Sequence, residues 1–227
     1  YRILFSRPAT EDEIRIGRRF VTAETAPQRP PSLWRHGHGR FNTDEQKLSD
    51  FRPLKHFSKR GYHASNRFPD PKLHYLYLGA DSGHPGIDHD HAAVRRWISP
   101  IDGTIRIRGR LGHASPRGDG VRATIVSARS GAWGQWTAHN RQVPTSVETR
   151  KVRVGHIVDF VVDCVSEHSY DSFTWAPRIE QIRDGKVVAA WSSRHQFAGP
   201  TDSTGPGDPW SVYALTLLQS NGFLFVD

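Results

Sequence analysis

Residues 91–107 read His-Ala-Ala-Val-Arg-Arg-Trp-Ile-Ser-Pro-Ile-Asp-Gly-Thr-Ile-Arg-Ile. Val94–Ile98 is rich in residues that favour strands, Pro100–Gly103 has the composition of a tight turn, and Thr104–Leu111 alternates apolar and basic side chains. Successive side chains of a strand point to opposite faces, so this alternation predicts a strand with one apolar and one basic face. The apolar face is predicted to hold Ile105, Ile107 and Leu111, and the basic face Arg106, Arg108 and Arg110.

The pattern of short strands and turns continues on both sides of this hairpin. A Gly-Asp-Gly turn at 118–120 precedes a further alternating stretch, and β-rich segments bounded by turn residues recur as far as Trp191. The sequence therefore predicts a mainly β protein, a jelly-roll-like antiparallel β-sandwich of about eight or more strands with short α-helices flanking it at both termini. Beyond the hairpin, the predicted strands are Leu73–Leu78, Val121–Ala128, Val147–Val154, Ile157–Asp163, Phe173–Ile182 and Val187–Trp191.

The region before Leu73 has a weaker pattern. His36 and His38 lie in a histidine- and glycine-rich segment and are predicted to have a loop or turn role, because two histidines are too few for a metal site. Phe51–Phe68 is aromatic but aperiodic, and we expect it to pack across the sandwich.

Two linkers divide the chain into three predicted parts. One is the proline-rich segment Ala26–Ser32, and the other is the Pro/Gly/Ser-rich segment Gly199–Asp208. Thr10 and Glu13 form a capping box that is typical of a helix start, and Pro209 suits the first turn of a second helix ending near residue 220. The parts are a helical flank at 1–26, a β-sandwich domain at 27–198, and a linker with a C-terminal helix at 199–227. The two helices are expected to pack against each other or against one end of the sandwich.

The chain carries an excess of positive charge. Its formal net charge is +8 at pH 7 and its sequence pI is about 10.0, which favours a polyanionic partner such as nucleic acid or an acidic or sulfated polysaccharide. The basic residues come without a recognisable nucleic-acid-binding motif, so nucleic acid is not expected. No apolar run approaches the roughly 18 residues of a membrane span. The chain begins at Tyr1 and lacks methionine, so we expect a piece of a longer protein, with any signal peptide outside it.

Tryptophan is unusually frequent, with seven residues in the chain. Flat aromatic faces stack against the C–H faces of sugars, while polar neighbours bind the hydroxyl groups. Trp133 and Trp136 flank a glycine near a turn and are the best candidates for an exposed platform, whereas Trp97 and Trp175 fit a sandwich core. The predicted ligand-binding residues are Trp133, Trp136, Arg106, Arg108 and Arg110, and the planar guanidinium groups favour acidic or sulfated glycans.

The loop at residues 79–91 is the densest cluster of potential metal ligands. Its histidines and aspartates suit a divalent ion, but the spacing matches no standard zinc or calcium loop, and Asx-type turns explain the same residues. If a metal binds here, His84, Asp88 and His91 are the expected ligands. The alternative is a structural calcium ion held by sandwich-end carboxylates such as Asp119 or Asp171. A structural divalent ion such as calcium is the only cofactor that the sequence leaves open.

Catalytic constellations are not evident in the sequence. Asp159 and Asp163 form a carboxylate pair, but they are predicted to lie on a solvated strand face, and there is no nucleophile elbow. The single cysteine, Cys164, follows an apolar run and is predicted to be a buried thiol and not a nucleophile. The chain is therefore predicted not to be an enzyme.

Both ends of the chain and its middle resemble one family. Residues 4–14, Leu-Phe-Ser-Arg-Pro-Ala-Thr-Glu-Asp-Glu-Ile, and the C-terminal Leu-Leu-Gln-Ser-Asn-Gly-Phe-Leu-Phe-Val-Asp are similar to the two ends of the PSD1 region in large planctomycete surface proteins. Gly222 replaces a glutamate that the family pattern expects. The inserted β-domain of that family is matched by Gly83-His84-Pro85-Gly86, His91–Trp97, Pro100-x-Asp102-Gly103, Gly118–Val121, Asp159-Phe160 and Asp171-Ser172-Phe173-x-Trp175-x-Pro177.

The resemblance covers most of the chain and is specific in combination. It implies an extracytoplasmic bacterial protein, located in the periplasm, at the cell surface or outside the cell, with a sandwich similar to galactose-binding-like or carbohydrate-binding modules. It brings no established catalytic residues, and the Cys-x-x-Cys-His haem motif is missing from this sequence.

Two functions remain after this reading. The first is a non-catalytic carbohydrate-binding module that binds a polysaccharide, acidic or sulfated, through exposed aromatic and arginine side chains. The second is a structural or docking domain that packs against the rest of a multidomain parent protein, which an exposed apolar patch on the terminal helices would favour.

Overall fold

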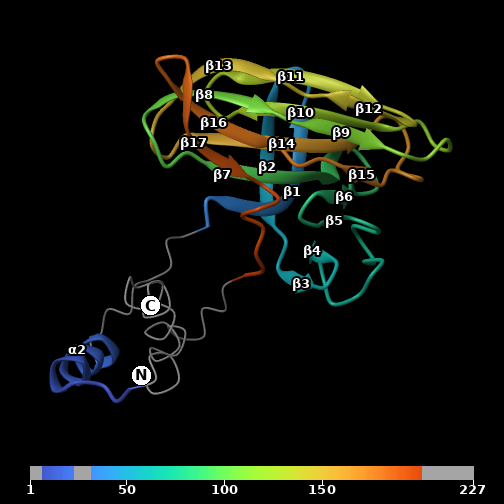
Figure 1. The fold of residues 1–227 in the computed structure, drawn as a ribbon. Helices are drawn as coiled ribbons and strands as arrows, with labels where there is room; N and C mark the ends of the chain where they lie inside the picture. The colour runs from blue at the N-terminus through green and yellow to red at the C-terminus, as the bar shows by residue number, and fades with distance from the viewer. Residues whose placement is uncertain (1–6, 23–31, 201–227) are drawn as a thin grey trace. The chain divides into compact units, whose positions relative to one another are not determined.

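The computed structural model describes residues 7–22 and 32–200, which belong to two compact units. In the first unit, helix α2 (Glu11–Thr22) begins at the predicted capping box, where the Thr10 backbone N–H donates to Glu13 at 2.8 Å and the Glu13 N–H donates to the Thr10 hydroxyl at 3.3 Å. The C-terminal helix predicted from Pro209 lies outside the described residues, so its packing stays a prediction. The second unit, Ser32–Pro200, holds all the described strands (Figure 1).

The second unit is mainly β, as predicted, and its strands pair antiparallel in three sheets. The six-stranded sheet has the order β11 (Gly131–Ala138), β10 (Val121–Ser127), β14 (Ile157–Cys164), β7 (Ala92–Ile98), β1 (Trp34–Asn42), β2 (Lys47–Pro53). The seven-stranded sheet has the order β12 (Arg141–Pro144), β9 (Arg110–His113), β15 (Phe173–Thr174), β6 (Ser82–His84), β5 (Tyr77–Leu78), β4 (Gly61–His63), β3 (His56–Ser58). The four-stranded sheet has the order β13 (Val147–Val152), β8 (Gly103–Arg108), β16 (Arg178–Arg183), β17 (Lys186–Ser192). A 3-10 turn, η1 (His89–His91), leads into β7.

The two smaller sheets continue into each other along the chain. β8 runs into β9 past Gly109, β12 runs into β13 past Thr145, and β15 is followed by β16 after Trp175. At this seam, the Trp175 indole N–H donates to the Thr145 hydroxyl at 2.9 Å, and the Thr145 backbone N–H donates to the Gly109 carbonyl at 2.9 Å. A side chain at position 109 would meet both partners, so the seam requires glycine there.

One hydrophobic core joins the six-stranded sheet to the two smaller sheets. Every second side chain of β14 enters this core: Val158, Phe160 and Val162 are fully buried in it. From the other layer come the predicted apolar residues of the central hairpin, Ile105, Ile107 and Leu111, all at most 1% exposed. A smaller cluster around Phe41, Val94 and Val161 is separate from this core. Cys164 is buried, as predicted, and burial first and then neighbouring carboxylates raise the pKa of its thiol to about 11.

The structure corrects three predictions. Leu73–Leu78 is not a continuous strand, because His74 adopts a left-handed backbone in a turn closed by Asp70 and only Tyr77–Leu78 pairs as β5. The loop predicted for His36 and His38 is wrong, since both lie on strand β1. Thr104–Leu111 and Phe173–Ile182, each predicted as one strand, are both broken in two at the seam. The jelly-roll connectivity stays a prediction.

Candidate carbohydrate-binding site

Strand β11 forms one edge of the six-stranded sheet and carries both predicted platform tryptophans. Residues 133 and 136 are three apart, so strict alternation would send their side chains to opposite faces. The pairing with β10 shifts here: Ile125 faces Gly134 and Val126 faces Ala132, which leaves Trp133 as the extra residue of a β-bulge. Both indoles therefore pack against the main core while staying half-buried.

Trp133 is fixed by neighbours from one other strand and two turns. Its indole N–H donates to the Ser130 hydroxyl at 2.8 Å, and its ring lies edge-on to the His156 ring with centroids 6.0 Å apart. The Arg150 guanidinium, from the edge strand β13, lies over the ring 5.9 Å from its centroid. The indole of Trp133 thus packs against the core and also lies beside the positive charge of Arg150.

Trp136 has a different setting. It pairs opposite Ala123, whose side chain is in the core, and its ring covers the backbone of Gly134, where an added Cβ would lie only 2.4 Å from the indole. Trp136 therefore supports the bulge from the core side and offers a smaller free face than the sequence suggests.

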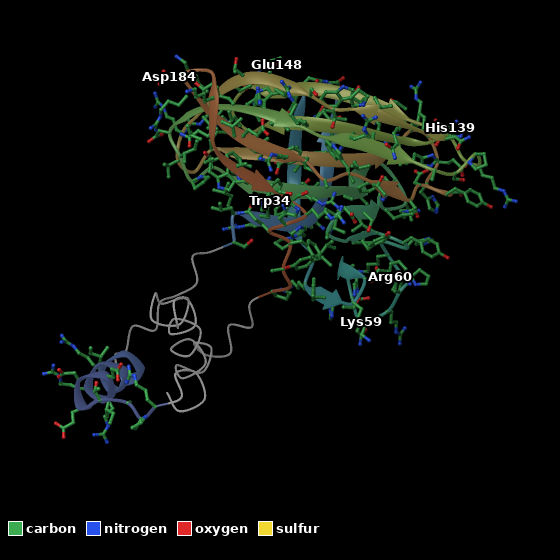
Figure 2. All side chains as sticks on the ribbon, in the orientation of Figure 1. Trp34, Lys59, Arg60, His139, Glu148 and Asp184 are labelled. Carbon is green, nitrogen blue, oxygen red and sulfur yellow. The ribbon has the colours of Figure 1, made fainter. Side chains whose placement is uncertain are left out.

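An open hollow of about 830 Å³ lies next to Trp133, at the end of the sandwich where β8 starts and β10 and β13 end. This is also the end that carries the turn labelled at Asp184 in Figure 2, because Ile182 of β16 pairs with Thr104 of β8. The polar residues that line the hollow are Asp102, Thr104, Arg129, Ser130, Lys151, Arg153 and His156.

The hollow is rich in uncompensated positive charge. Within residues 7–22 and 32–200, none of the four cations at and beside it, Arg129, Arg150, Lys151 and Arg153, forms an ion pair with a carboxylate. The one carboxylate of the lining, Asp102, accepts the backbone N–H of Val154 at 3.0 Å. An anion entering the hollow would therefore meet three lining cations, Arg129, Lys151 and Arg153, that have no acidic partner among the described residues, with Arg150 nearby over Trp133.

His156 is a neutral member of the hollow. Burial, and then the charge of Arg129, lowers the pKa of its imidazole below 6.5, and its Nε2 lies 2.8 Å from the Ser127 hydroxyl. Because this shift keeps the ring uncharged at pH 7, His156 contributes hydrogen bonding and shape, and the charge comes from arginine and lysine.

The three arginines predicted as a row lie on two strands of different sheets, Arg106 and Arg108 on β8 and Arg110 on β9, and differ in their partners. Arg106 donates to Glu180 at 2.7 Å, and Arg108 forms a two-point ion pair with Glu148 at 2.9 and 3.1 Å. Arg110 lies beyond the seam, on β9, and is exposed. Two of the three guanidinium groups are therefore already occupied by carboxylates.

The predicted metal ligands are only partly brought together. Asp88 accepts the Asp90 backbone N–H as the cap of η1, and its Oδ1 lies 2.6 Å from His91 Nδ1. His84 is buried, with Nδ1 2.7 Å from the Pro85 carbonyl. Across the described parts of the chain, no three His, Cys, Asp or Glu side chains converge as a metal-binding group. The Asx-type turn that the sequence also allowed accounts for Asp88 and His91.

Asp159 and Asp163 correct the sequence reading, which placed them on a solvated face. Both carboxylates are only 2% exposed. Each forms a two-point ion pair with an arginine of a neighbouring strand, Asp159 with Arg96 at 2.7 and 2.9 Å and Asp163 with Arg122 at 3.0 and 2.6 Å. Burial raises the pKa of Asp159 while Arg96 opposes the rise. The two ion pairs connect β14 to its neighbours β7 and β10 in the six-stranded sheet.

The hollow's cations were missed by the sequence reading. Arg129 lies in the turn after β10, whereas Lys151 and Arg153 lie at the end of β13. Their only signal is that basic residues stand at strand ends, and only the pairing of the sheets shows that these ends meet.

No protein-family model matches the chain, and no curated protein matches it. Three solved structures show a limited likeness: the C-terminal CBM6 of LamC, a marine laminarinase from Zobellia galactanivorans (18% identity, 43% of this chain and 77% of that chain, TM-score 0.28); the PA14 sugar-binding domain from an RTX adhesin (14%, 49% and 57%, TM-score 0.29); and the PA14 domain of the MpAFP antifreeze protein (9%, 44% and 52%, TM-score 0.26). Because these TM-scores lie below 0.5, nothing about this chain is inferred from them. Among the described residues, no helix is long and apolar enough to cross a membrane.

Proposed function

We propose that this chain is a non-catalytic carbohydrate-binding domain that holds an acidic or sulfated polysaccharide at the hollow beside Trp133, near the edge strands β11 and β13. One observation carries the proposal: three cations without an acidic partner among the described residues line an open hollow, and a fourth, Arg150, lies over the half-buried Trp133 beside it. Sulfate and carboxylate groups recur along such polymers, so a cluster of cations engages several of them at once, and guanidinium groups bind each through paired hydrogen bonds.

Trp133 supplies the second element of recognition. A sugar ring that stacks on the exposed part of the indole places its own substituents towards Arg150 and the hollow, because the Arg150 guanidinium already lies over that ring. Trp136, Arg110 and the ion-paired Arg106 and Arg108 extend the proposed surface along the same flank, with the two paired arginines engaging a glycan only by leaving their glutamates.

A second candidate, the docking domain, is favoured by helix α2. Ile14 and Ile16 are large apolar residues of this helix and are 49% and 59% exposed. Residues two apart in a helix do not share a face, so these are two separate exposed apolar positions, and either would suit packing against a neighbouring region of a longer protein. We propose, with the family resemblance, that this parent is an extracytoplasmic bacterial protein, so that docking by α2 and glycan binding by the sandwich serve the same molecule.

The test compares retention of the purified chain on a sulfated, a carboxylated and a neutral polysaccharide by affinity electrophoresis. We expect retention by the charged polymers, and a loss of about tenfold or more in affinity for the double variant Lys151→Ala/Arg153→Ala, since both side chains are exposed cations of the hollow. The matched control is Lys55→Ala/Lys59→Ala, which removes two exposed cations beside β3, away from the hollow (Figure 2), and should bind as the parent does.

Three results would contradict the glycan proposal. Equal losses in both double variants would show that net charge alone decides binding. Retention by the neutral polymer only would place the site elsewhere, on uncharged aromatic surface. No retention on any polymer would leave the docking domain as the function of this chain.

A further inference from the structure

The opposite end of the sandwich holds a carboxylate that is buried without a partner. Asp171, in the loop between β14 and β15, has an exposed fraction of 0%, and neither of its oxygens receives a hydrogen bond from the described residues. Buried carboxylates are normally paired or hydrogen-bonded, because removing an unpaired charge from water costs several kcal/mol. Asp171 therefore needs a proton or a cation.

The neighbours of Asp171 increase this need. Asp119 precedes β10, and its Oδ1 is also buried without a partner, while its Oδ2 accepts the Glu167 backbone N–H at 3.3 Å. Asp119, Glu167 and Asp163 all act on Asp171 as negative charges and, after burial itself, raise the pKa of its carboxyl to about 8. Of these acids, only Asp163 has a cationic partner, Arg122, in the part of the chain that is described.

The two loops that carry these aspartates lie directly against each other. Gly118 and Gly120 have φ of 75° and 93°, and a Cβ at Gly118 would lie 2.4 Å from the carbonyl oxygen of Ser169. Tyr170, next to Asp171, also has a left-handed backbone with φ of 69°. This close approach places the Ser169 carbonyl against the backbone that directly precedes Asp119.

The available donors are oxygen atoms. His168 lies in the same loop as Asp171 and packs edge-on against His74, with ring centroids 5.6 Å apart. Both nitrogens of His113 are engaged, Nε2 with the Tyr170 carbonyl at 2.9 Å and Nδ1 with the Asn140 N–H at 3.2 Å. Calcium accepts six to eight oxygen ligands in flexible geometry and draws them from carboxylates, backbone carbonyls and water. Such a site needs only two carboxylate side chains, so it is compatible with the lack of a three-side-chain cluster among the described residues.

We propose that Asp119 and Asp171 bind a calcium ion that joins the 114–120 loop to the 165–172 loop. The ion neutralises the unpartnered carboxylates and fixes the start of β10 relative to the start of β15. It lies at the far end of β10 from the cationic hollow, so it serves stability and does not contact the proposed glycan site.

The experiment measures thermal unfolding of the chelator-treated chain with added CaCl₂ or MgCl₂. At a calcium concentration about 100 times its Kd, we expect a rise in Tm of about 5–10 °C, with a smaller response to magnesium, which demands octahedral geometry. Asp171→Asn and Asp119→Asn should lose the response to calcium. In the absence of metal at pH 8, Asp171→Asn should have a higher Tm than the parent. The matched control, Asp184→Asn, changes an exposed carboxylate at the other end (Figure 2) and should respond as the parent does.

Direct binding keeps the proposal testable if a variant folds poorly. Equilibrium dialysis with radioactive calcium should find one ion per parent chain and none per folded Asp171→Asn chain. A different result is that the parent binds no calcium at millimolar concentration although the Asp171→Asn substitution raises the Tm. This result would show that Asp171 is buried as a protonated carboxyl and does not bind a metal. Calcium binding that persists in both asparagine variants would place the ion elsewhere. Either result overturns the site without affecting the glycan proposal.

Discussion

At the scale of single residues, His36 couples stability to pH. Its ring stacks on Tyr62 with centroids 4.5 Å apart, its Nε2 has no partner among the described residues, and burial, followed by the charge of Arg95, lowers its pKa from 6.5 to about 3. A depressed pKa of this kind gives stability that is present above the unfolded value of about 6.5 and is lost as the pH falls towards 3.

The prediction concerns His36→Phe, which keeps an aromatic ring in the stack and removes the proton-binding group. Between pH 7 and pH 4.5, protonation of His36 in the unfolded chain should cost the parent about 2 kcal/mol that the variant does not lose. Urea unfolding at the two pH values measures this as a change in the free-energy difference between the two proteins. Parallel pH profiles would show that His36 does not titrate in this way.

At the scale of elements, the seam at Gly109, Thr145 and Trp175 is where three strands change from one sheet to the next. A Cβ at position 109 would lie 2.8 Å from the Thr145 hydroxyl and 3.0 Å from the Trp175 indole nitrogen, which are hydrogen-bonded to each other. Gly109→Ala should therefore push this buried pair apart and cost about 1–3 kcal/mol of unfolding free energy.

A double-mutant cycle tests this reason. Thr145→Ala alone leaves the Trp175 N–H unpaired, but it also makes room for a methyl group at position 109, so the double variant should cost less than the sum of the two single variants by about 0.5 kcal/mol or more. Chemical denaturation of the four proteins gives the coupling. Strict additivity would mean that the methyl group is accommodated without contact at the seam.

At the scale of the whole sandwich, the cationic hollow and the Asp119–Asp171 pair lie at opposite ends. Arg129, Lys151 and Arg153 lie at the end where β10 finishes, and Asp119 and Asp171 lie at the end where it starts. The seven residues of β10 span roughly 20 Å at 3.3 Å per residue. His139 marks the acidic end and Asp184 the cationic end in Figure 2, in agreement with the approach of Gly120 to His139.

The exposed cations of the hollow predict that the affinity for a sulfated polysaccharide decreases with salt concentration. Exposed charges are screened over about 10 Å at 0.1 M ionic strength, so raising NaCl from 0.05 to 0.5 M should weaken binding to a sulfated polysaccharide by about tenfold or more, and the slope should be shallower for Lys151→Ala/Arg153→Ala than for the parent. Titration by fluorescence at several salt concentrations measures both slopes. Affinity that does not change with salt would rule out the hollow as the site of attachment.

The sequence predicted those features that depend on local alternation. Ile105, Ile107 and Leu111 are buried because a strand alternates wherever one side meets a core, and the capping box at Thr10 and Glu13 needs only four consecutive residues. β1 was missed because glycines and histidines replace the usual β-branched residues, while its pairing with β7 supplies the strand. Asp159 and Asp163 were misplaced because their partners, Arg96 and Arg122, lie on other strands.

The candidate site was predicted in part. Trp133 was recognisable from its place beside a glycine near a turn, but its environment depends on a bulge that one strand cannot reveal by itself. The hollow requires the turn after β10 and the end of β13 to meet, and they are more than 20 residues apart in the chain. Such sites depend on sheet register, which pairing between distant strands decides.

The gathering of Arg129, Lys151 and Arg153 at one end of the sandwich gives the domain a leading face. A negatively charged polymer attracts that end first, so encounter with a polyanionic gel would favour orientations in which the hollow faces the polymer. A surface covered by many bound copies would then expose the opposite end of each sandwich, with the loops at 114–120 and 165–172, on its outer side.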